Sequence, residues 1–410
     1  MLILSEHLRD GHRRAGDLAS ALGIQRSTLT RAFEREPELI RVGRARSTAY
    51  ALPIVWQGLD QDRYSIYRVD EDGRQHADGS LITLAGNESI WEPNTTIVDG
   101  LRVELHDIAP RGFLGRSFAR RHTDLHLPDD VTNWSDHHVL IALTQRGEDL
   151  PGNLIVGDAS LSRFEGLSTE PVSADDFHSY AEAAMAGEHA GSSAGGEQPK
   201  FTAFYNGEHR IIKFANDTTD NTRRWQDLLA LEHLASQTLH DHGIASAESE
   251  LLDHGNMRYL IVRRFDRVAA RGRRSVITLA GAALANDAPI NATWTEAAST
   301  IEIGETDRAR IELLDDFGAL IANTDRHLYN IVLYSDQDGY RLAPSFDQLP
   351  MAYAPPASGN LRMSPIALPE PSQQDAAEMA RDYWSRASGS SQVSGSMSGF
   401  ADVHLKFLST

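Results

Sequence analysis

The stretch IANTDRHLYNIVLY (residues 321–334) decides the fold, because it places three polar side chains directly before a β-branched apolar run. Asp325, His327 and Asn330 lie within six residues of one another. An aspartate can accept a proton from a hydroxyl, and an asparagine can offer a neutral oxygen to a hard metal ion. Taken alone, the same pattern also fits a polar turn between a helix and a strand. The flanking sequence must therefore separate an active-site loop from an ordinary connection.

The residues around this stretch predict a helix, a loop and a hairpin. DRARIELLDDFGALIAN (307–323) carries apolar residues at helical spacing and predicts a helix that ends at its last residue. NIVLY (330–334) and YRLAP (340–344) are expected to form two strands around the turn SDQDG, and Asp347 follows. This order places the loop aspartate, the loop asparagine and Asp347 at one end of the hairpin. Such a group suits Mg²⁺ held by an Asn and an Asp, with a further Asp as proton acceptor, as in phosphoryl transfer.

The second half of such a site must hold a nucleotide, and the scarcity of lysine indicates where. Only three of the 39 basic residues are lysines, and two of these, Lys200 and Lys213, lie close together in the sequence. Lys200 closes a glycine-rich segment, AGEHAGSSAGGEQPKF (186–201), and Lys213 lies in the strand-like run HRIIKFA. A predicted helix over 223–243 follows and carries Glu232. A lysine on a strand after a glycine loop, ahead of a helix with a glutamate, is the layout with which kinase folds grip phosphate.

The first 53 residues predict a small DNA-binding domain. Helices are expected at MLILSEHLRDG (1–11), AGDLASALG (15–23) and IQRSTLTRAFERE (24–36), followed by the hairpin LIRVGRARSTAYAL (39–52). This pattern resembles a winged helix-turn-helix, in which the third helix enters the major groove and the wing touches the backbone. A helical protein-interaction module is the alternative. The residues expected to face DNA are Gln25, Arg26, Ser27, Thr28, Thr30 and Arg31 on the helix, and Arg44 and Arg46 on the wing.

Composition and charge limit the class of protein. At 410 residues the chain is long enough for about two to four domains, and 41% hydrophobic residues suffice for packed cores. The net charge of −19 argues against nucleic-acid binding over the whole surface, although residues 1–53, with nine Arg against six Asp and Glu, can still bind phosphate. No apolar run approaches the roughly 18 residues of a membrane span, and no signal peptide is evident. Without cysteine, disulfides and thiolate metal sites are excluded, and a cytoplasmic protein with no membrane partner is expected.

The remaining segments carry expectations about structure rather than chemistry. Residues 54–170 are expected to be strand-rich. The expected strands are DRYSIYRV (62–69), LRVELHDI (101–108) and HHVLIAL (137–143). On a strand, the adjacent histidines of the last run would point to opposite faces, which disfavours a shared metal ion. Seven of the sixteen prolines fall within 344–371 and argue against a long helix there, and the serine-rich run ASGSSQVSGSMSG (387–399) is expected to be a mobile linker before a last short helix.

Five motifs together resemble the HipA family of bacterial serine/threonine kinases, the toxins of toxin–antitoxin modules. They occur in family order over residues 100–385 and read SSAGGEQPKF, IIKFA, VRRFDRV, NTDRHLYNIVL and FDQLP. The resemblance implies an α+β, bilobal protein-kinase-like fold with a strand-rich N-lobe and a helical C-lobe, here preceded by the winged helix-turn-helix. The expected domains are 1–53 for DNA binding, 54–265 for the strand-rich subdomain and N-lobe, and 266–410 for the C-lobe. In the family a separate antitoxin usually supplies the DNA-binding part, so this chain looks like a stand-alone branch.

The resemblance also implies roles for individual residues. Asp325 would be the general base, and Asn330 and Asp347 would ligate Mg²⁺. Lys213 would contact the ATP phosphates, with Glu232 as its partner. The further nucleotide-binding residues would be Ser193, Gly195, Gly196 and Lys200 of the glycine-rich loop, Arg263 and Phe265 of the adenine hinge, and His327, which either orders the loop or approaches the γ-phosphate.

Two positions depart from the family pattern, and a third leaves a choice open. Arg263 stands where the hinge commonly has an acidic residue, and FDQ replaces an Asp followed by apolar residues. Ser193 occupies the position of the loop serine whose autophosphorylation switches such kinases off, and the adjacent Ser192 is the alternative acceptor.

Together, the residues and the resemblance imply an ATP- and Mg²⁺-dependent serine/threonine protein kinase with a fused DNA-binding domain for regulation. Its partners would be a protein substrate, of which an aminoacyl-tRNA synthetase is one family target, and double-stranded DNA, bound as a homodimer. One alternative is a DNA-binding regulator whose kinase fold is inactive or only senses nucleotide, against which the intact lysine, aspartates and asparagine argue. Another is a different metal-dependent phosphoryl enzyme. A lipid kinase lacks support from a basic membrane-facing patch, and a nuclease leaves the glycine loop and Lys213 unexplained.

Overall fold

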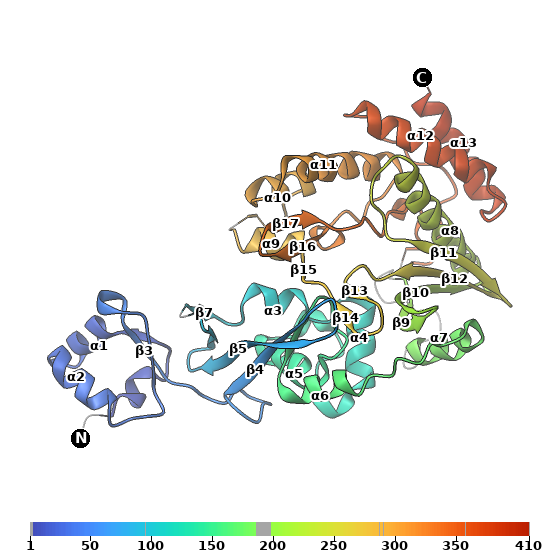
Figure 1. Cartoon of the computed structure of the whole chain (residues 1–410). Helices are drawn as coiled ribbons and strands as arrows, with labels where there is room; N and C mark the ends of the chain where they lie inside the picture. The colour runs from blue at the N-terminus through green and yellow to red at the C-terminus, as the bar shows by residue number, and fades with distance from the viewer. Residues whose placement is uncertain are drawn as a thin grey trace. The chain divides into compact units, whose positions relative to one another are not determined.

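The computed structural model describes residues 3–94, 96–185, 198–286, 288–289, 291–356 and 358–409. The chain folds as two compact units (Figure 1). The first unit consists of Met1–Asp70, Arg74–Pro110 and His122–Leu167, and the second of Glu71–Gly73, Arg111–Arg121 and Ser168–Thr410. The boundaries expected after residues 53 and 265 each fall within a unit, so they stay a prediction about subdomains.

The first unit begins with short helices packed beside a small sheet. A 3₁₀ turn covers Ser5–Leu8, which is shorter than the helix expected there, and helices α1 (Ala15–Ala21) and α2 (Arg26–Phe33) follow. Gly23 has a φ of +64°, a backbone conformation that favours glycine, and α1 ends just before it as the sequence predicts. The antiparallel sheet has the order β1–β3–β2. Its strands are β1 (Arg13–Arg14), β2 (Ile40–Val42) and β3 (Ala49–Ala51).

The small sheet shares a core with the rest of the first unit, and we call this contact the joint. Its apolar cluster consists of Val42, Ala49 and Ala51 from the small sheet and Ile82, Leu84 and Ile90 from the strands beyond it. Gly86 lies so close to Gly11 that a Cβ on Gly86 would come within 2.6 Å of the Gly11 Cα. The backbone N–H of His12 donates to Glu88 Oε2 at 2.8 Å. Residues 1–53 are therefore packed into the first unit.

A five-stranded antiparallel sheet of order β7–β6–β5–β4–β8 forms the centre of the first unit. Its strands are β4 (Arg63–Val69), β5 (Gln75–Leu84), β6 (Glu88–Glu92), β7 (Ile97–Asp99) and β8 (Leu154–Val156). The remaining α-helices of the unit are α3 (Val103–Asp107), α5 (Asp136–Arg146) and α6 (Asp158–Glu165). Apolar side chains of β4, β5, α3 and α5 pack into one core, which confirms the strand predicted at 62–69.

Two of the expected strands are helices. Residues 101–108 contain α3 and residues 137–143 lie inside α5, so both strand predictions are wrong. Ser135 caps α5, because its backbone N–H and hydroxyl both lie 3.0 Å from the His138 Nδ1 at the first turn. The apolar run that follows is buried throughout, so it lacks the polar alternation that would separate a helix from a strand. Because His137 and His138 lie on a helix, they do not alternate between opposite faces as they would on a strand.

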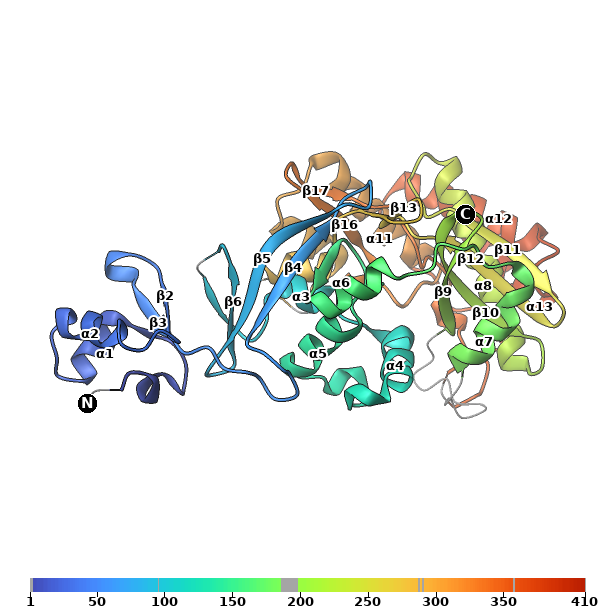
Figure 2. The same cartoon turned by 60° about the horizontal axis from the view of Figure 1, so that its bottom comes forward.

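The second unit contains a four-stranded antiparallel sheet of order β11–β12–β10–β9 with a long helix against it (Figure 2). The strands are β9 (Lys200–Tyr205), β10 (Glu208–Asn216), β11 (Ser249–His254) and β12 (Met257–Arg263), and the helix is α8 (Asp220–Asp241). Strand β10 and helix α8 confirm the strand-like run around Lys213 and the helix predicted over 223–243. Helices α4 (Gly112–Arg121) and α7 (Phe177–Met185) contact β9, the strand at one edge of the sheet.

The rest of the second unit is mostly helical. Its helices are α9 (Leu279–Leu284), α10 (Trp294–Thr300), α11 (Glu305–Leu320), α12 (Gln374–Gly389) and α13 (Gly395–Leu408). Its strands are β13 (Arg267–Val268), β14 (Gly272–Arg273), β15 (Val276–Thr278), β16 (Val332–Asp336) and β17 (Gly339–Leu342), with β15–β16–β17 forming one sheet. Helix α11 and the hairpin β16–β17 confirm the order predicted for 307–344. No helix in the described part of the chain is long and apolar enough to cross a membrane.

The serine-rich run 387–399 is an ordered connection, so the mobile linker expected there is wrong. Helix α12 continues to Gly389 and α13 begins at Gly395. Val393 and Met397, which lie between the serines, are buried in the core of the second unit. These apolar side chains order a segment whose composition alone suggests flexibility. The described residues of 344–371 contain only a 3₁₀ turn, Met351–Tyr353, as their proline content predicts.

Candidate active site

Lys213 forms the centre of a buried ionic cluster in the second unit. It lies on β10, opposite Leu260 of β12 on one side and Lys200 of β9 on the other. Its Nζ donates to Glu232 of α8, at 2.6 Å from Oε1 and 2.8 Å from Oε2. The same Nζ also donates to Asp347 Oδ1. The side chains of Lys213 and Glu232 are each 7% exposed, so the helix, the strand and the segment after β17 meet at a desolvated ion cluster.

Burial and charge act in opposite directions on this cluster. Burial favours the neutral form of Lys213, but Asp347 and Glu232 outweigh it and raise the pKa of the lysine. Burial also raises the pKa of Asp347, whereas Lys213 and Lys200 lower it, and the result is a lowered pKa. For Glu232 the burial dominates and its pKa is raised. Lys213 and Asp347 are therefore charged at neutral pH.

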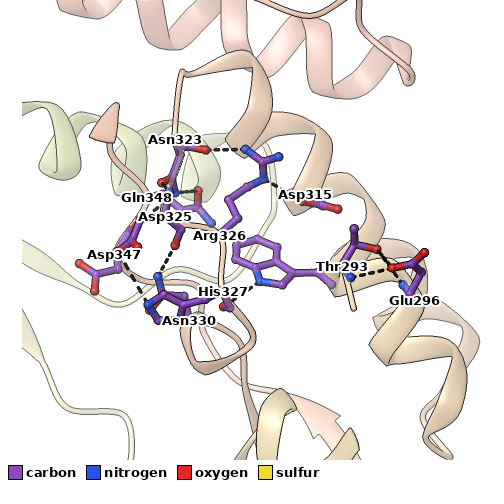
Figure 3. A network of polar contacts seen from close by, with 11 residues as sticks. Thr293, Glu296, Asp315, Asn323, Asp325, Arg326, His327, Asn330, Asp347 and Gln348 are labelled. Carbon is purple, nitrogen blue, oxygen red and sulfur yellow. Dashed lines mark hydrogen bonds and ion pairs between the residues drawn. The ribbon is translucent and has the colours of Figure 1, made fainter. Parts of the chain in front are cut away.

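A buried asparagine links Asp347 to the loop of the opening stretch (Figure 3). Asn323 is 1% exposed, and its Nδ2 donates to the Asp347 carbonyl at 3.4 Å and to Gln348 Oε1 at 3.3 Å. Its Oδ1 accepts the backbone N–H of Asp325 at 3.0 Å. The Asn323 side chain thus hydrogen-bonds to the backbone of both Asp325 and Asp347. Asp347 has a φ of +57°, a left-handed conformation that a non-glycine residue adopts at some cost in energy.

The loop presents Asp325 toward solvent and turns Asn330 inward. The Asp325 side chain is 51% exposed, whereas Asn330 is 7% exposed. Asn330 Nδ2 donates to the Asp325 carbonyl at 2.7 Å, so its Oδ1 is the atom that could meet a cation. His327 Nε2 lies 3.8 Å from Asp325 Oδ2, and its ring is half exposed. A carboxylate with this exposure can accept a proton from an incoming hydroxyl.

Residues that sequence reasoning missed hold this loop in place. Arg326 Nε donates to Asp315 of α11 at 2.9 Å, and Arg326 Nη1 donates to the Asn323 carbonyl. Trp294 Nε1 of α10 donates to the His327 carbonyl at 2.9 Å. The available signal for Asn323 was its place directly after the apolar run ALIA (319–322), because an Asn in such a place is buried only when it is hydrogen-bonded.

The donor set fits a magnesium ion better than a metal held by protein alone. Asn330 and Asp347 offer one amide oxygen and one carboxylate, which are hard ligands of the kind Mg²⁺ accepts. Mg²⁺ typically takes one or two carboxylates and completes its shell with phosphates and water. Within the described residues, no group of three or more His, Cys, Asp or Glu side chains is arranged to hold a metal. Asn330 and Asp347 would therefore leave most of the shell of a Mg²⁺ ion to phosphate oxygens and water.

The expected hinge lies at the end of β12, beside a small pocket. Arg263 is ion-paired with Glu208 at 3.1 Å and Glu248 at 3.0 Å, and Phe265 packs on Phe346, with ring centroids 5.8 Å apart. The pocket is lined by Glu232, Ser236 and Leu239 of α8, Ala247, Ser249 and Val262 of the sheet region, and Ser345, Phe346, Asp347 and Gln348. Its lining includes Val262, which directly precedes Arg263, together with Glu232 and Asp347 of the buried ionic cluster.

The remaining predicted residues fall in two groups. Ser192, Ser193, Gly195 and Gly196 lie outside the described residues. In the first unit, the eight residues predicted to face DNA are all exposed, six on or beside α2 and two between β2 and β3. The structure therefore brings Lys213, Glu232, Asp325, Asn330 and Asp347 together in the second unit and leaves the basic positions on the surface of the first.

Comparison with known proteins places these features in a family. The model of the HipA-like C-terminal domain matches residues 192–396, and that of the YjjJ-like toxin middle domain matches 60–165. Toxin YjjJ of Escherichia coli is 35% identical over 389 residues, which cover 88% of this chain and 86% of the relative. The HipA structure from Shewanella oneidensis, solved with HipB and operator DNA, has a TM-score of 0.55 at 14% identity and covers 84% of this chain and 95% of that chain.

Proposed function

The chain belongs to the HipA-like toxin family, as a YjjJ-like toxin with the fold of HipA, and on this premise we propose that its second unit is an ATP- and Mg²⁺-dependent serine/threonine protein kinase. The observation that carries the proposal is the buried contact of Lys213 with Glu232 and Asp347, next to Asp325 and Asn330. This combination supplies a cation for phosphates, two metal ligands and a proton acceptor.

Each residue has a distinct role in the proposed transfer. Lys213, oriented by Glu232, binds the phosphates of ATP as a point charge. Asn330 and Asp347 hold Mg²⁺, which when bound neutralises charge on the phosphates. Asp325 accepts the proton of the substrate hydroxyl as that oxygen attacks. In these roles, contacts with phosphate and metal would replace part of the Lys213–Asp347 contact.

Incubation of the full chain with radiolabelled ATP and Mg²⁺, with and without cell lysate, tests the kinase. Wild type should label itself or a lysate protein, and Asp325→Asn should still bind nucleotide but not transfer phosphate, since an amide cannot accept the proton. Asp338→Asn is the matched control, because Asp338 is exposed in the turn at the far end of the β16–β17 hairpin. Equal labelling by wild type and Asp325→Asn would contradict the assignment.

A second function, DNA binding by residues 1–53, is supported by the exposed basic residues of the first unit. We infer a winged helix-turn-helix in which α2 enters the major groove and the β2–β3 hairpin is the wing. Arg26 and Arg31 lie on α2, and Arg44 and Arg46 lie on the hairpin connection. The operator DNA of the Shewanella structure belongs to a complex of that HipA with HipB. Here the same chain would carry the DNA-binding part and could bind as a homodimer.

The DNA-binding proposal is best tested on the full chain, because the joint buries part of the wing sheet. Binding to duplex DNA should weaken steeply with salt, and Arg31→Ala or Arg44→Ala should weaken it further. Arg163→Ala, an exposed arginine on α6 of the same unit, should bind like wild type. Salt-insensitive binding, or equal loss in all three variants, would favour the protein-interaction module.

The labelling assay also distinguishes the protein kinase from three different classes of protein. A nucleotide-sensing regulator would bind ATP without transferring phosphate to any protein. A lipid kinase would label phosphoinositide vesicles rather than protein, and a nuclease would cleave DNA with Mg²⁺ in the absence of ATP. The labelled lysate band would identify the protein target, and we propose an aminoacyl-tRNA synthetase as one candidate for it.

A further inference from the structure

Helix α8 is hydrogen-bonded through Asp227 to Ser394, the residue directly before α13. Asp227 of α8 is 6% exposed, and both of its carboxylate oxygens bind Ser394. The Ser394 backbone N–H donates to Oδ1 at 2.7 Å, and its hydroxyl donates to Oδ2 at 2.6 Å. Hydrogen bonds to a buried carboxylate are among the stronger ones in proteins. The serine-rich run that the kinase proposal does not use therefore has a defined contact with α8.

Neighbouring contacts join the same segment to the same end of α8. Arg258 Nη1 of β12 donates to the carbonyl of Gln392 at 2.6 Å and to that of Gln226 at 3.2 Å. The guanidinium of Arg224 lies 5.7 Å from the centroid of the Phe400 ring of α13. Helices α12 and α13 lie beside α8 in the structure (Figure 1). The first half of α8 is thus bound to the C-terminal helices at several points.

Helix α8 is bound to the sheet on both sides of Glu232. Before it, Gln226 Nε2 donates to the Ala215 carbonyl of β10 at 3.2 Å. His233 Nδ1 lies 2.8 Å from Ser249 Oγ, and Ser236 Oγ donates to the Ala247 carbonyl at 2.8 Å. Glu232 and Ser236 also border the small pocket, and side chains that line an unfilled space lack contacts on that side. Glu232 therefore lies between two anchoring points of the helix, one at Asp227 and one at residues 233–236.

We propose that Ser394 and Asp227 are positioning residues, which hold α8 so that Glu232 meets Lys213. The proposal rests on the proposed kinase function, because it assigns to the C-terminal helices control over the lysine that binds ATP phosphate. Losing the contact removes one anchor of the first half of α8 and weakens the Lys213–Glu232 pair. Because one hydrogen bond to a buried carboxylate is removed, Ser394→Ala should lower phosphotransfer about tenfold.

A negative charge at position 394 should act more strongly than loss of the hydroxyl. In Ser394→Asp a carboxylate would replace a donor beside the buried Asp227, and two close carboxylates repel. The turn must then separate from α8. Ser394→Thr keeps the backbone and hydroxyl donors and should behave like wild type. Ser391→Asp is the matched control, because Ser391 lies in the same connection and is exposed.

Hydrogen exchange of the full chain tests the position of α8 without any need for phosphotransfer. In Ser394→Asp, amides of residues 228–236 should exchange about tenfold faster than in wild type and in Ser391→Asp. Unchanged exchange in that segment would overturn the proposal, even if the kinase is active. Exchange that rises equally throughout the second unit would also overturn it, because that result describes general destabilisation.

A double-mutant cycle then tests whether the effect passes through Glu232. Ser394→Ala should lower autophosphorylation about tenfold in the wild-type background, but change it less than about twofold in a Glu232→Gln background. Equal fold-losses in both backgrounds would show that Ser394 acts elsewhere. If wild type transfers no phosphate, the proposed kinase function fails, and the exchange experiment alone decides the role of Ser394 and Asp227.

Discussion

His404 is a buried histidine whose protonation should couple the stability of the second unit to pH. It lies on α13, is 1% exposed, and its Nε2 is 2.5 Å from the Tyr353 hydroxyl. That hydroxyl also accepts the backbone N–H of Ile366 at 3.0 Å, so it is a donor toward a neutral imidazole. Burial lowers the pKa of His404 from 6.5 to about 4. Trp384 packs on the same ring, with centroids 4.6 Å apart.

The direction of the effect follows from which state binds the proton. As the pH falls below 6.5 the unfolded chain protonates His404, while the folded chain keeps it neutral down to about pH 4. The contribution of His404 to the free energy of unfolding is therefore fully present above pH 6.5 and is lost as the pH falls toward 4. At about 1.36 kcal/mol per unit of pKa difference, the full loss is about 3 kcal/mol, of which about 2 kcal/mol should be gone at about pH 5.

Urea unfolding at about pH 7.5 and pH 5, followed by tryptophan fluorescence, measures this loss. His404→Gln should show a smaller drop between the two pH values, by about 2 kcal/mol, because a glutamine does not titrate but can still accept from Tyr353. The exposed His240 at the end of α8 provides the control His240→Gln, which should keep the wild-type drop. Identical pH dependence in wild type and His404→Gln would refute the reasoning.

Other substitutions test the site itself. Asp347→Ala should weaken Mg²⁺-dependent binding of a fluorescent ATP analogue, whereas Asp325→Asn should leave that binding intact. Weaker binding in Asp325→Asn but not in Asp347→Ala would contradict the roles given to the two aspartates. Asn323→Ala should cost about 1–3 kcal/mol in urea unfolding and lower phosphotransfer at least about tenfold, because it leaves buried polar groups unpaired; a loss of stability without loss of transfer would make it purely structural. Ser193→Asp should be less active and Ser193→Ala more persistently active, and mass spectrometry after ATP incubation should find phosphate on Ser193 or Ser192.

Much of the second unit could be predicted, because its signals are local and ordered along the chain. Apolar periodicity marked α8 and α11, and their flanking strands alternate or carry β-branched runs. The rarity of lysine made Lys213 conspicuous, and its order before Asp325, Asn330 and Asp347 indicated which residues would meet. The contact of Lys213 with Asp347, across more than a hundred residues, is a matter of packing and could be inferred only from the layout of the fold.

The wrong or missing predictions have physical causes that are not visible in the sequence. In 137–143 an apolar run is buried on all sides of a helix, so period-based reasoning cannot separate helix from strand. In 387–399 the serines and glycines suggested flexibility, but the buried Val393 and Met397 hold the connection in the core. Asn323 was missed because its partners, Asp347 and Gln348, are distant in sequence and its role depends on where the chain returns.

The joint between the small sheet β1–β3–β2 and the five-stranded sheet limits how the two proposed activities can be separated by mutation. A deletion that removes residues 1–53 would uncover Ile82, Leu84 and Ile90 and leave an exposed apolar patch on the five-stranded sheet. We expect the truncated protein to aggregate or to be degraded. A loss of toxicity in cells that express it would therefore not show that DNA binding matters. Single charge changes on α2 leave the patch covered, so they are the cleaner way to silence one activity while sparing the other.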